Sequence, residues 1–199
     1  MTIADLDNVL VLHGPPLTRL TDEEFFDLCQ HNPSLRLERT ATHEILAMPP
    51  AGSESSRKSG EVYGQLWLWN RKYQLGRVYE SSAGFTLPDG SVRSPDAAWL
   101  SEAAFAQLPE AERQRFPPVC PAFVVEVRSP SDGLPTLRRK METYLANGVQ
   151  LGFLLDPAAE TATVYRPGQA PEEVSSFEGK LSGESILPGF ELDLAPLRR

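Results

Sequence analysis

The sequence is short of cysteine, histidine and long apolar runs, and each shortage excludes a class of protein. Its two cysteines, Cys29 and Cys120, are too few for a disulfide framework and lack metal-ligand spacing, which indicates a reducing, cytoplasmic compartment. His13, His31 and His43 have no partner acid or cysteine at zinc-ligand spacing, so zinc is not expected. Because no apolar run matches a membrane span and no basic segment precedes an apolar stretch at the N-terminus, we expect neither a transmembrane helix nor a signal peptide.

A phosphate-binding loop and a general excess of basic residues are also missing. The glycines at 52, 60 and 64 fit neither the Walker nor the dinucleotide spacing. The chain has 27 acidic and 19 basic residues, a net charge of −8, which argues against nonspecific coating of nucleic acid. The bases are nevertheless concentrated in residues 57–77 and 128–140, so a local basic cleft is compatible with the overall acidity.

The length of 199 residues suits one compact domain. We interpret residues 1–20, with Gly14, Pro15 and Pro16, as a loosely packed arm, and residues 21–199 as a single domain. Thr21 and Glu24 have the spacing of a capping box, which predicts a helix to about Gln30.

Periodicity and turn signals predict the remaining elements. A polar loop at 51–58 precedes a helix at 59–75, which Ser59 caps and Gly76 ends. The turn Pro88-Asp89-Gly90 joins two strands of a hairpin. A surface helical insertion breaks near Pro109, and a later helix ends at Asn147-Gly148. Strands are expected at 35–39, 43–48, 77–87, 92–100, 122–128 and 151–155, with short strands beyond Asp156.

The strand at 122–128 is the most informative segment. It is apolar on both faces, as buried strands are, except for Glu126 and Arg128, which share one face because side chains alternate along a strand. Asp96 follows Pro95 on the second hairpin strand. If the strands at 92–100 and 122–128 are neighbours, Asp96 and Glu126 converge on one point. Two carboxylates and a strand carbonyl suit magnesium or manganese, which can activate a bound water.

Each of these residues also has an ordinary structural interpretation. Asp96 could form a turn or pair with Arg93, and Glu126 could form a buried ion pair with Arg128 or Lys140. Glu61, in the first turn of its predicted helix, could simply favour the helix dipole.

The segments around these residues resemble the Uma family of restriction-endonuclease-like proteins, a former domain of unknown function within the PD-(D/E)xK nuclease superfamily. The resemblance is carried by VRSPDAAWL, PAFVVEVRSPSD and LRRKMETYLANGVQLGFLLDP. It extends from about Leu20 to Leu194 through LTDEEFFDLCQ, LRLERTATHEILAMPP, GEVYGQLWLWN and LSGESILPGFELDL. The number of segments in the same order makes the match specific.

This resemblance implies an α/β fold with a restriction-endonuclease-like core, a central mixed β-sheet flanked by helices, and extra N-terminal and C-terminal β-strands. It also implies hydrolysis of DNA phosphodiesters with Mg²⁺ or Mn²⁺, and often a homodimer. Asp96 matches the aspartate of the PD motif, Glu126 matches the first position of (D/E)xK, and the Val127 carbonyl would be a further metal ligand. Glu61 matches the helix acid that often completes such sites, and Lys140 stands where a migrated lysine could lie.

Arg128 departs from the family pattern because it occupies the usual lysine position. Arginine stays protonated, so it can stabilise charge but cannot act as a base. Three explanations are compatible with the sequence: Lys140 has replaced that lysine, metal-bound water needs no such base, or activity has been lost. The competing functions are therefore a metal-dependent endonuclease, an inactive nuclease-fold dimer that binds DNA or supports assembly, and a phosphodiesterase acting on RNA or nucleotides.

Overall fold

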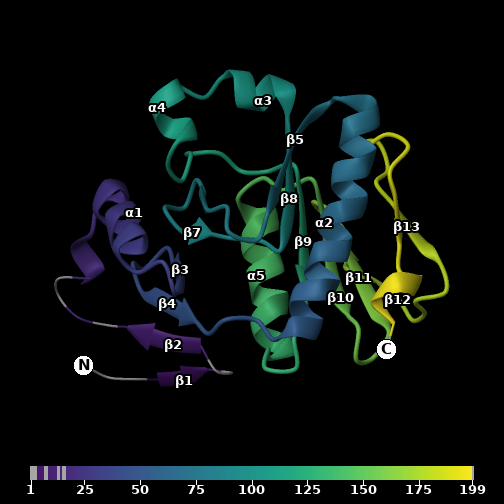
Figure 1. Ribbon diagram of the computed structural model, residues 1–199, viewed down its shortest axis with the longest axis horizontal. Helices are drawn as coiled ribbons and strands as arrows, with labels where there is room; N and C mark the ends of the chain where they lie inside the picture. Colours follow the sequence, from purple (N-terminus) through teal and green to yellow (C-terminus); the bar gives the residue numbers. More distant parts are fainter. Residues whose placement is uncertain (1–3, 7–8, 13, 15–16, 199) are drawn as a thin grey trace.

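A mixed β-sheet forms the centre of the larger part of the molecule (Figure 1). The computed structural model describes residues 4–6, 9–12, 14 and 17–198. The strand order is β12-β11-β10-β9-β8-β5, in which β9 and β10 are parallel and the other neighbours antiparallel. The strands are β5 (Gly76–Glu80), β8 (Ala97–Ser101), β9 (Phe123–Val127), β10 (Leu151–Asp156), β11 (Thr161–Tyr165) and β12 (Glu172–Val174). This arrangement confirms the expected mixed α/β fold class.

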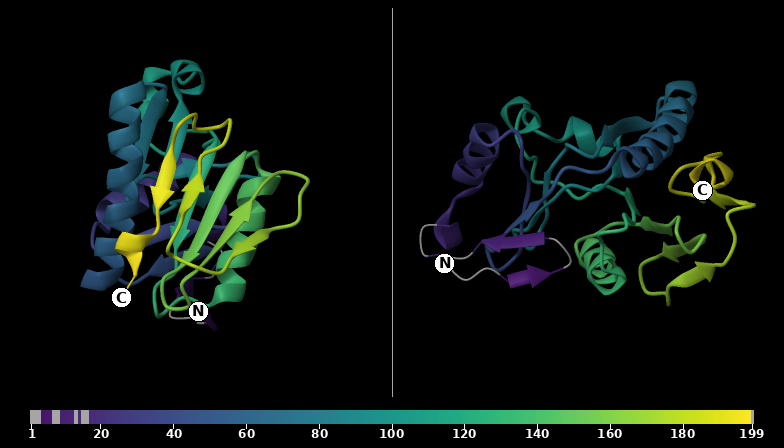
Figure 2. Two further views of the ribbon diagram at one scale, coloured as in Figure 1. Left: turned by 90° about the vertical axis from the view of Figure 1, so that its right-hand side faces the viewer. Right: turned by 60° about the horizontal axis from the view of Figure 1, so that its bottom comes forward.

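Helices cover both faces of this sheet, as Figure 2 shows. Helix α2 (Ser53–Tyr73) packs with the C-terminal segment on one face, where Val62 and Leu66 meet Val125 of β9. Helix α5 (Leu134–Ala146) packs on the other face, where Met141 meets Val124. Since side chains alternate along a strand, even-numbered residues of β9 point toward α5. The fully buried pattern of β9 follows from this double cover.

A second sheet lies at the N-terminal side and has the order β1-β2-β4-β3-β7-β6. Its core contains Phe25 of α1 (Asp22–His31), which packs with Leu37 and Ile45. The capping box of α1 is confirmed: Thr21 and Glu24 exchange side-chain to backbone hydrogen bonds. The strands of this sheet are β1 (Ala4–Leu6), β2 (Val9–Leu12), β3 (Arg36–Arg39), β4 (Ile45–Met48), β6 (Phe85–Thr86) and β7 (Val92–Arg93).

The prediction of a loosely packed arm is wrong for part of residues 1–20. Strand β2 pairs with β4 in the register Val11↔Leu46, and Val11 is buried. The hairpin β3–β4 offers an edge whose backbone groups need partners, and β2 supplies them. His13 lies outside the described residues.

The predicted helix at 59–75 begins earlier and ends earlier than expected. It starts at Ser53 after Gly52, so the loop at 51–58 is mostly helical, and Ser59 lies inside the helix. It ends at Tyr73, and Gln74 adopts the left-handed conformation that was expected of a glycine. Gly76 instead begins β5, where close approach to the backbone of β8 leaves no space for a side chain.

The two long strands predicted around the Pro88-Asp89-Gly90 turn are each divided between the sheets. Residues 77–87 give β5 and β6, and residues 92–100 give β7 and β8. Strands β6 and β7 pair across the turn as predicted, with Gly90 at a φ of 81°. The break before β8 falls at Pro95, because proline cannot donate to a ladder.

The remaining elements agree with the sequence patterns. Helices α3 (Glu102–Ala106) and α4 (Glu110–Arg113) form the insertion broken at Pro109. Strands β13 (Lys180–Ser182) and β14 (Glu191–Asp193) pair near the C-terminus. Short 3-10 helices span Leu17–Arg19 and Ala195–Leu197. No helix in the described ranges combines the length and apolar character needed to cross a membrane.

Candidate active site

Glu126 is a buried carboxylate on the face of β9 that α5 covers. Only 4% of the residue is exposed. Lys140 Nζ lies 2.7 Å from its Oε1, and the Tyr144 hydroxyl donates to the same oxygen over 2.9 Å. Lys140 and Tyr144 are one helical turn apart on α5, so both reach Glu126 from the same helix face. Of the two ion pairs considered for Glu126, the structure forms the one with Lys140.

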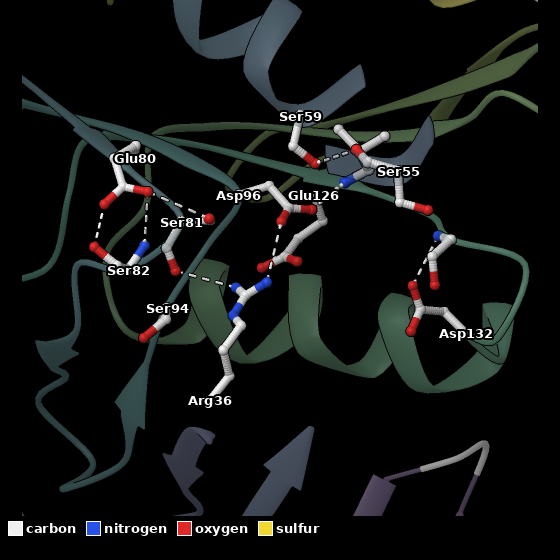
Figure 3. Close-up of polar contacts among 12 residues, drawn as sticks. Arg36, Ser55, Ser59, Glu80, Ser81, Ser82, Ser94, Asp96, Glu126 and Asp132 are labelled. Atoms are coloured by element: carbon white, nitrogen blue, oxygen red, sulfur yellow. Dashed lines mark hydrogen bonds and ion pairs between the residues drawn. The ribbon is translucent and has the colours of Figure 1, made fainter. Parts of the chain in front are cut away.

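Asp96 lies next to Glu126 at the point where β8 begins. Ala97 is paired with Val125 in the antiparallel ladder, so the preceding residue is placed beside Glu126. Asp96 Oδ2 accepts a hydrogen bond from the Val127 backbone N–H over 2.8 Å, and Arg36 Nη1 lies 3.9 Å from Oδ1. Figure 3 shows the Asp96 and Glu126 carboxylates side by side above the Arg36 guanidinium. The expected convergence of the two acids is therefore present.

Burial makes both carboxylates hard to ionise. It raises the pKa of Glu126 to about 7, and the neighbouring Asp96 and Glu38 charges add to the rise although Lys140 opposes it. Burial likewise raises the pKa of Asp96, against the hydrogen bond from Val127 and the attraction of Arg36 and Lys140. Two neighbouring desolvated carboxylates create a strong preference for an added positive charge.

Lys140 is the cation that contacts Glu126. Its Nζ lies 2.7 Å from Glu126 Oε1, 2.8 Å from Glu38 Oε1 and 3.5 Å from the Ser94 carbonyl oxygen. Burial alone would lower the pKa of Lys140, but the two carboxylates outweigh it and raise the pKa above its ordinary value. Lys140 is therefore an ammonium group held beside the paired acids, at the place where a migrated lysine was considered.

Arg128 does not join this cluster. Its Nη1 donates to Asp156 Oδ2 over 2.6 Å, and its Nε donates to the Asp132 carbonyl oxygen over 3.0 Å. Arg128 follows the last residue of β9, so it lies at the sheet end, where β10 also ends in Asp156. The residue at the usual lysine position thus has a structural partner of its own.

Glu61 has a hydrogen-bond partner on its own helix. It is in the interior of α2, which covers the sheet face opposite α5, and its Oε1 accepts from Gln65 Nε2 over 3.1 Å. Gln65 in turn bonds the backbone of Asp193 in β14. The expected first-turn position of Glu61 was wrong because α2 starts at Ser53. Among the described residues, no three His, Cys, Asp or Glu side chains form a cluster suited to a metal ion.

Sequence reasoning missed two residues of β3 that reach the site. Arg36 and Glu38 share the face of β3 opposite Leu37, because the strand period is two. Arg36 also donates to the Ser81 carbonyl oxygen over 3.1 Å (Figure 3). The sequence did contain a signal for them: Arg36 and Glu38 are charged residues two positions apart on a predicted strand, and the residue between them, Leu37, is apolar. Arg93, considered as a partner for Asp96, pairs with Glu38 instead.

The donor set fits a hard divalent cation. Asp96 and Glu126 supply desolvated carboxylate oxygens, the ligands that Mg²⁺ and Mn²⁺ prefer. Because the N–H and C=O of one strand residue point to the same neighbour, the Val127 carbonyl faces the side of β9 that Asp96 occupies. These residues could hold the metal, with Lys140 as an adjacent positive charge.

Comparisons with known proteins identify relatives of this chain. The fold is similar to that of the crystal structure of a "putative nuclease belonging to DUF820" from Anabaena variabilis, with a TM-score of 0.72 and 22% sequence identity. The match covers 89% of this chain and 97% of that one, and it shows a shared fold. A search of curated proteins finds no match. The Uma2 family, described as "Putative restriction endonuclease", matches residues 22–195, and the chain belongs to this family.

Proposed function

We propose that this protein is a metal-dependent endonuclease that hydrolyses phosphodiester bonds in DNA. Asp96 and Glu126 are the metal ligands, with the Val127 carbonyl as a further one, and Lys140 is the catalytic lysine. Membership of the Uma2 family and the nuclease-like fold support the reaction class. The free thiols of Cys29 and Cys120 agree with a reducing, cytoplasmic compartment. The family resemblance also favours a homodimer.

The contact between Lys140 and Glu126 carries the proposal. In the PD-(D/E)xK pattern a lysine lies beside two converging carboxylates, and the strand that carries the second acid also carries the lysine. Here α5 supplies the lysine, and its Nζ reaches Glu126 Oε1 at 2.7 Å. Arg128, at the usual lysine position of the motif, forms an ion pair with Asp156. The proposed site therefore does not depend on a lysine at position 128.

Each residue has a defined task in this reaction. A bound Mg²⁺ or Mn²⁺ would supply Lewis acidity and lower the pKa of a coordinated water. Asp96 and Glu126 hold the positive charge, and the Val127 N–H fixes the orientation of Asp96. The two carboxylates raise the pKa of Lys140, so its task is to stabilise negative charge on the scissile phosphate as an ammonium group. Burial of the carboxylates strengthens all of these interactions.

Cleavage of supercoiled plasmid DNA in Mg²⁺ or Mn²⁺ tests the proposal. We expect nicking and linearisation that EDTA abolishes, and a loss of at least about 100-fold in Asp96→Asn and Glu126→Gln. Glu142→Gln is the matched control, because Glu142 is an exposed acid on α5 two residues from Lys140. All variants should keep the wild-type circular dichroism spectrum.

The alternative of an inactive nuclease-fold module predicts a different result. Wild-type protein that cuts no DNA with either metal, while still binding DNA in a gel-shift assay, would replace the endonuclease assignment with a binding role. Cleavage of RNA but not of DNA would replace the substrate class and leave the site assignment in place.

A further inference from the structure

Glu38 is a buried carboxylate that belongs to the other sheet. It is 2% exposed and lies on β3, and it contacts Lys140 Nζ at 2.8 Å. Arg93 Nη1 lies 3.0 Å from its Oε2, and the Ser94 backbone N–H donates to its Oε1 over 3.0 Å. Its contacts with a lysine and an arginine offset the cost of burying its charge.

Lys140 divides its charge between two carboxylates. Its Nζ is 2.7 Å from Glu126 Oε1 and 2.8 Å from Glu38 Oε1, so the two contacts are equivalent in length. Glu126 comes from β9 of the central sheet and Glu38 from β3 of the N-terminal sheet. The ammonium group therefore bridges the two sheets at the candidate metal site.

A divalent cation bound at Glu126 would change this balance. Two positive groups on one buried carboxylate repel each other, and the ammonium cannot be left without an acceptor in a buried site. Glu38 is already within contact distance of Lys140, so the ammonium keeps a full negative partner when the metal takes Glu126. Glu38 itself stays in place because Arg93 and the Ser94 N–H hold both of its oxygens.

We propose that Glu38 is a positioning residue, the carboxylate that retains Lys140 beside the site while a divalent cation occupies Asp96 and Glu126. This inference rests on the proposed function, because it requires the metal site. Without Glu38 the ammonium keeps Glu126 as its one carboxylate contact, beside the neutral Ser94 carbonyl oxygen, and competes with the metal for that carboxylate. Glu38 thus allows a metal ion and a lysine to be present together in one small buried space.

Calorimetric titration of the metal-free protein with Mn²⁺ tests the inference through binding rather than activity. We expect Glu38→Gln to weaken Mn²⁺ binding about tenfold, which corresponds to about 1.4 kcal/mol. Lys140→Met should tighten binding, because it removes the competing charge. In the Lys140→Met background, Glu38→Gln should have little further effect, since Glu38 acts through the lysine. Glu142→Gln, exposed on the same helix, should bind as wild type does.

The outcomes separate this inference from the proposed function. Wild-type protein that binds no Mn²⁺ would overturn the metal site itself. Wild-type binding with an unchanged Glu38→Gln affinity, or an equal loss in both backgrounds, would overturn the role of Glu38 alone. Thermal melting checks the fold of each variant. If Glu38→Gln does not fold, Glu38→Asp takes its place: the shorter side chain draws the carboxylate away from Lys140, so Mn²⁺ binding should weaken in the wild-type background and change little in the Lys140→Met background. Lys140→Met that binds Mn²⁺ no more tightly than wild type contradicts the competition.

Discussion

The Arg128 guanidinium and the Asp156 carboxylate form an ion pair of 2.6 Å at the ends of two parallel strands. Asp156 has 6% of its side chain exposed, and it also accepts from the backbone of Ala158 and Ala159. The pair therefore closes the end of the sheet and orders the following turn. It gives the arginine at this position a structural role.

Replacement of Arg128 should affect stability more than cleavage. Arg128→Gln leaves the Asp156 carboxylate without its cation, so we expect the free energy of unfolding to fall by about 2 kcal/mol. DNA cleavage should stay within about threefold of wild type, and Arg128→Lys should not increase it. Urea denaturation and plasmid cleavage measure the two effects. A clear gain of activity in Arg128→Lys would instead indicate that the motif position itself is catalytic.

Stability of the metal-free protein should depend on Glu38 at acid pH. The folded protein holds the pKa of Glu38 at about 2: burial raises it, but Lys140 and Arg93 outweigh burial. An unfolded glutamate has a pKa near 4.3. Since the folded pKa is the lower one, the stabilisation is complete above about pH 4.3 and is lost as the pH falls toward 2.

Urea unfolding at several pH values in EDTA measures this dependence. The difference in free energy of unfolding between wild type and Glu38→Gln should be largest near neutral pH and should shrink below pH 4. If the difference in free energy of unfolding stays constant down to pH 2.5, the ion pairs with Lys140 and Arg93 do not lower the pKa of Glu38 in the folded protein. Glu142→Gln, a change of the same kind at an exposed site, should leave the profile unchanged.

Gly76 should tolerate no side chain. A Cβ there would lie 2.1 Å from the Leu100 carbonyl oxygen and 2.8 Å from the Trp99 ring, so the pairing of β5 with β8 would have to shift. We expect Gly76→Ala to lower the free energy of unfolding by about 3 kcal/mol. Gly60→Ala is the control on α2, where the added carbon meets nothing within 4 Å. It should raise stability by about 0.5–1 kcal/mol, because alanine favours helix. Equal effects of the two substitutions in thermal melting would contradict this contrast.

Local patterns in the sequence were sufficient for much of the fold. The apolar run of β9 with its single acid, the Pro88-Asp89-Gly90 turn and the capping box of Thr21 are each specified by neighbouring residues. The placement of Asp96 beside Glu126 was also predictable. It required only the alternation of side chains along a strand and the assumption that the strands now seen as β8 and β9 are neighbours. Helix boundaries were less certain, since polar residues such as those at 53–58 fit a loop or a helix equally well.

The sequence by itself predicted the strands, the helices and the pair of acids, because strand and helix periods are local properties. The nuclease-like mixed sheet was implied by the resemblance of several ordered segments to a known family. Only the tertiary structure decided which cation serves that pair. Lys140 and Arg128 are both compatible with the pattern, and α5 packing directs Lys140 to Glu126 while the end of β10 takes Arg128. The roles of Arg36 and Glu38 also required the structure, because the contact between two sheets brings together residues more than fifty positions apart.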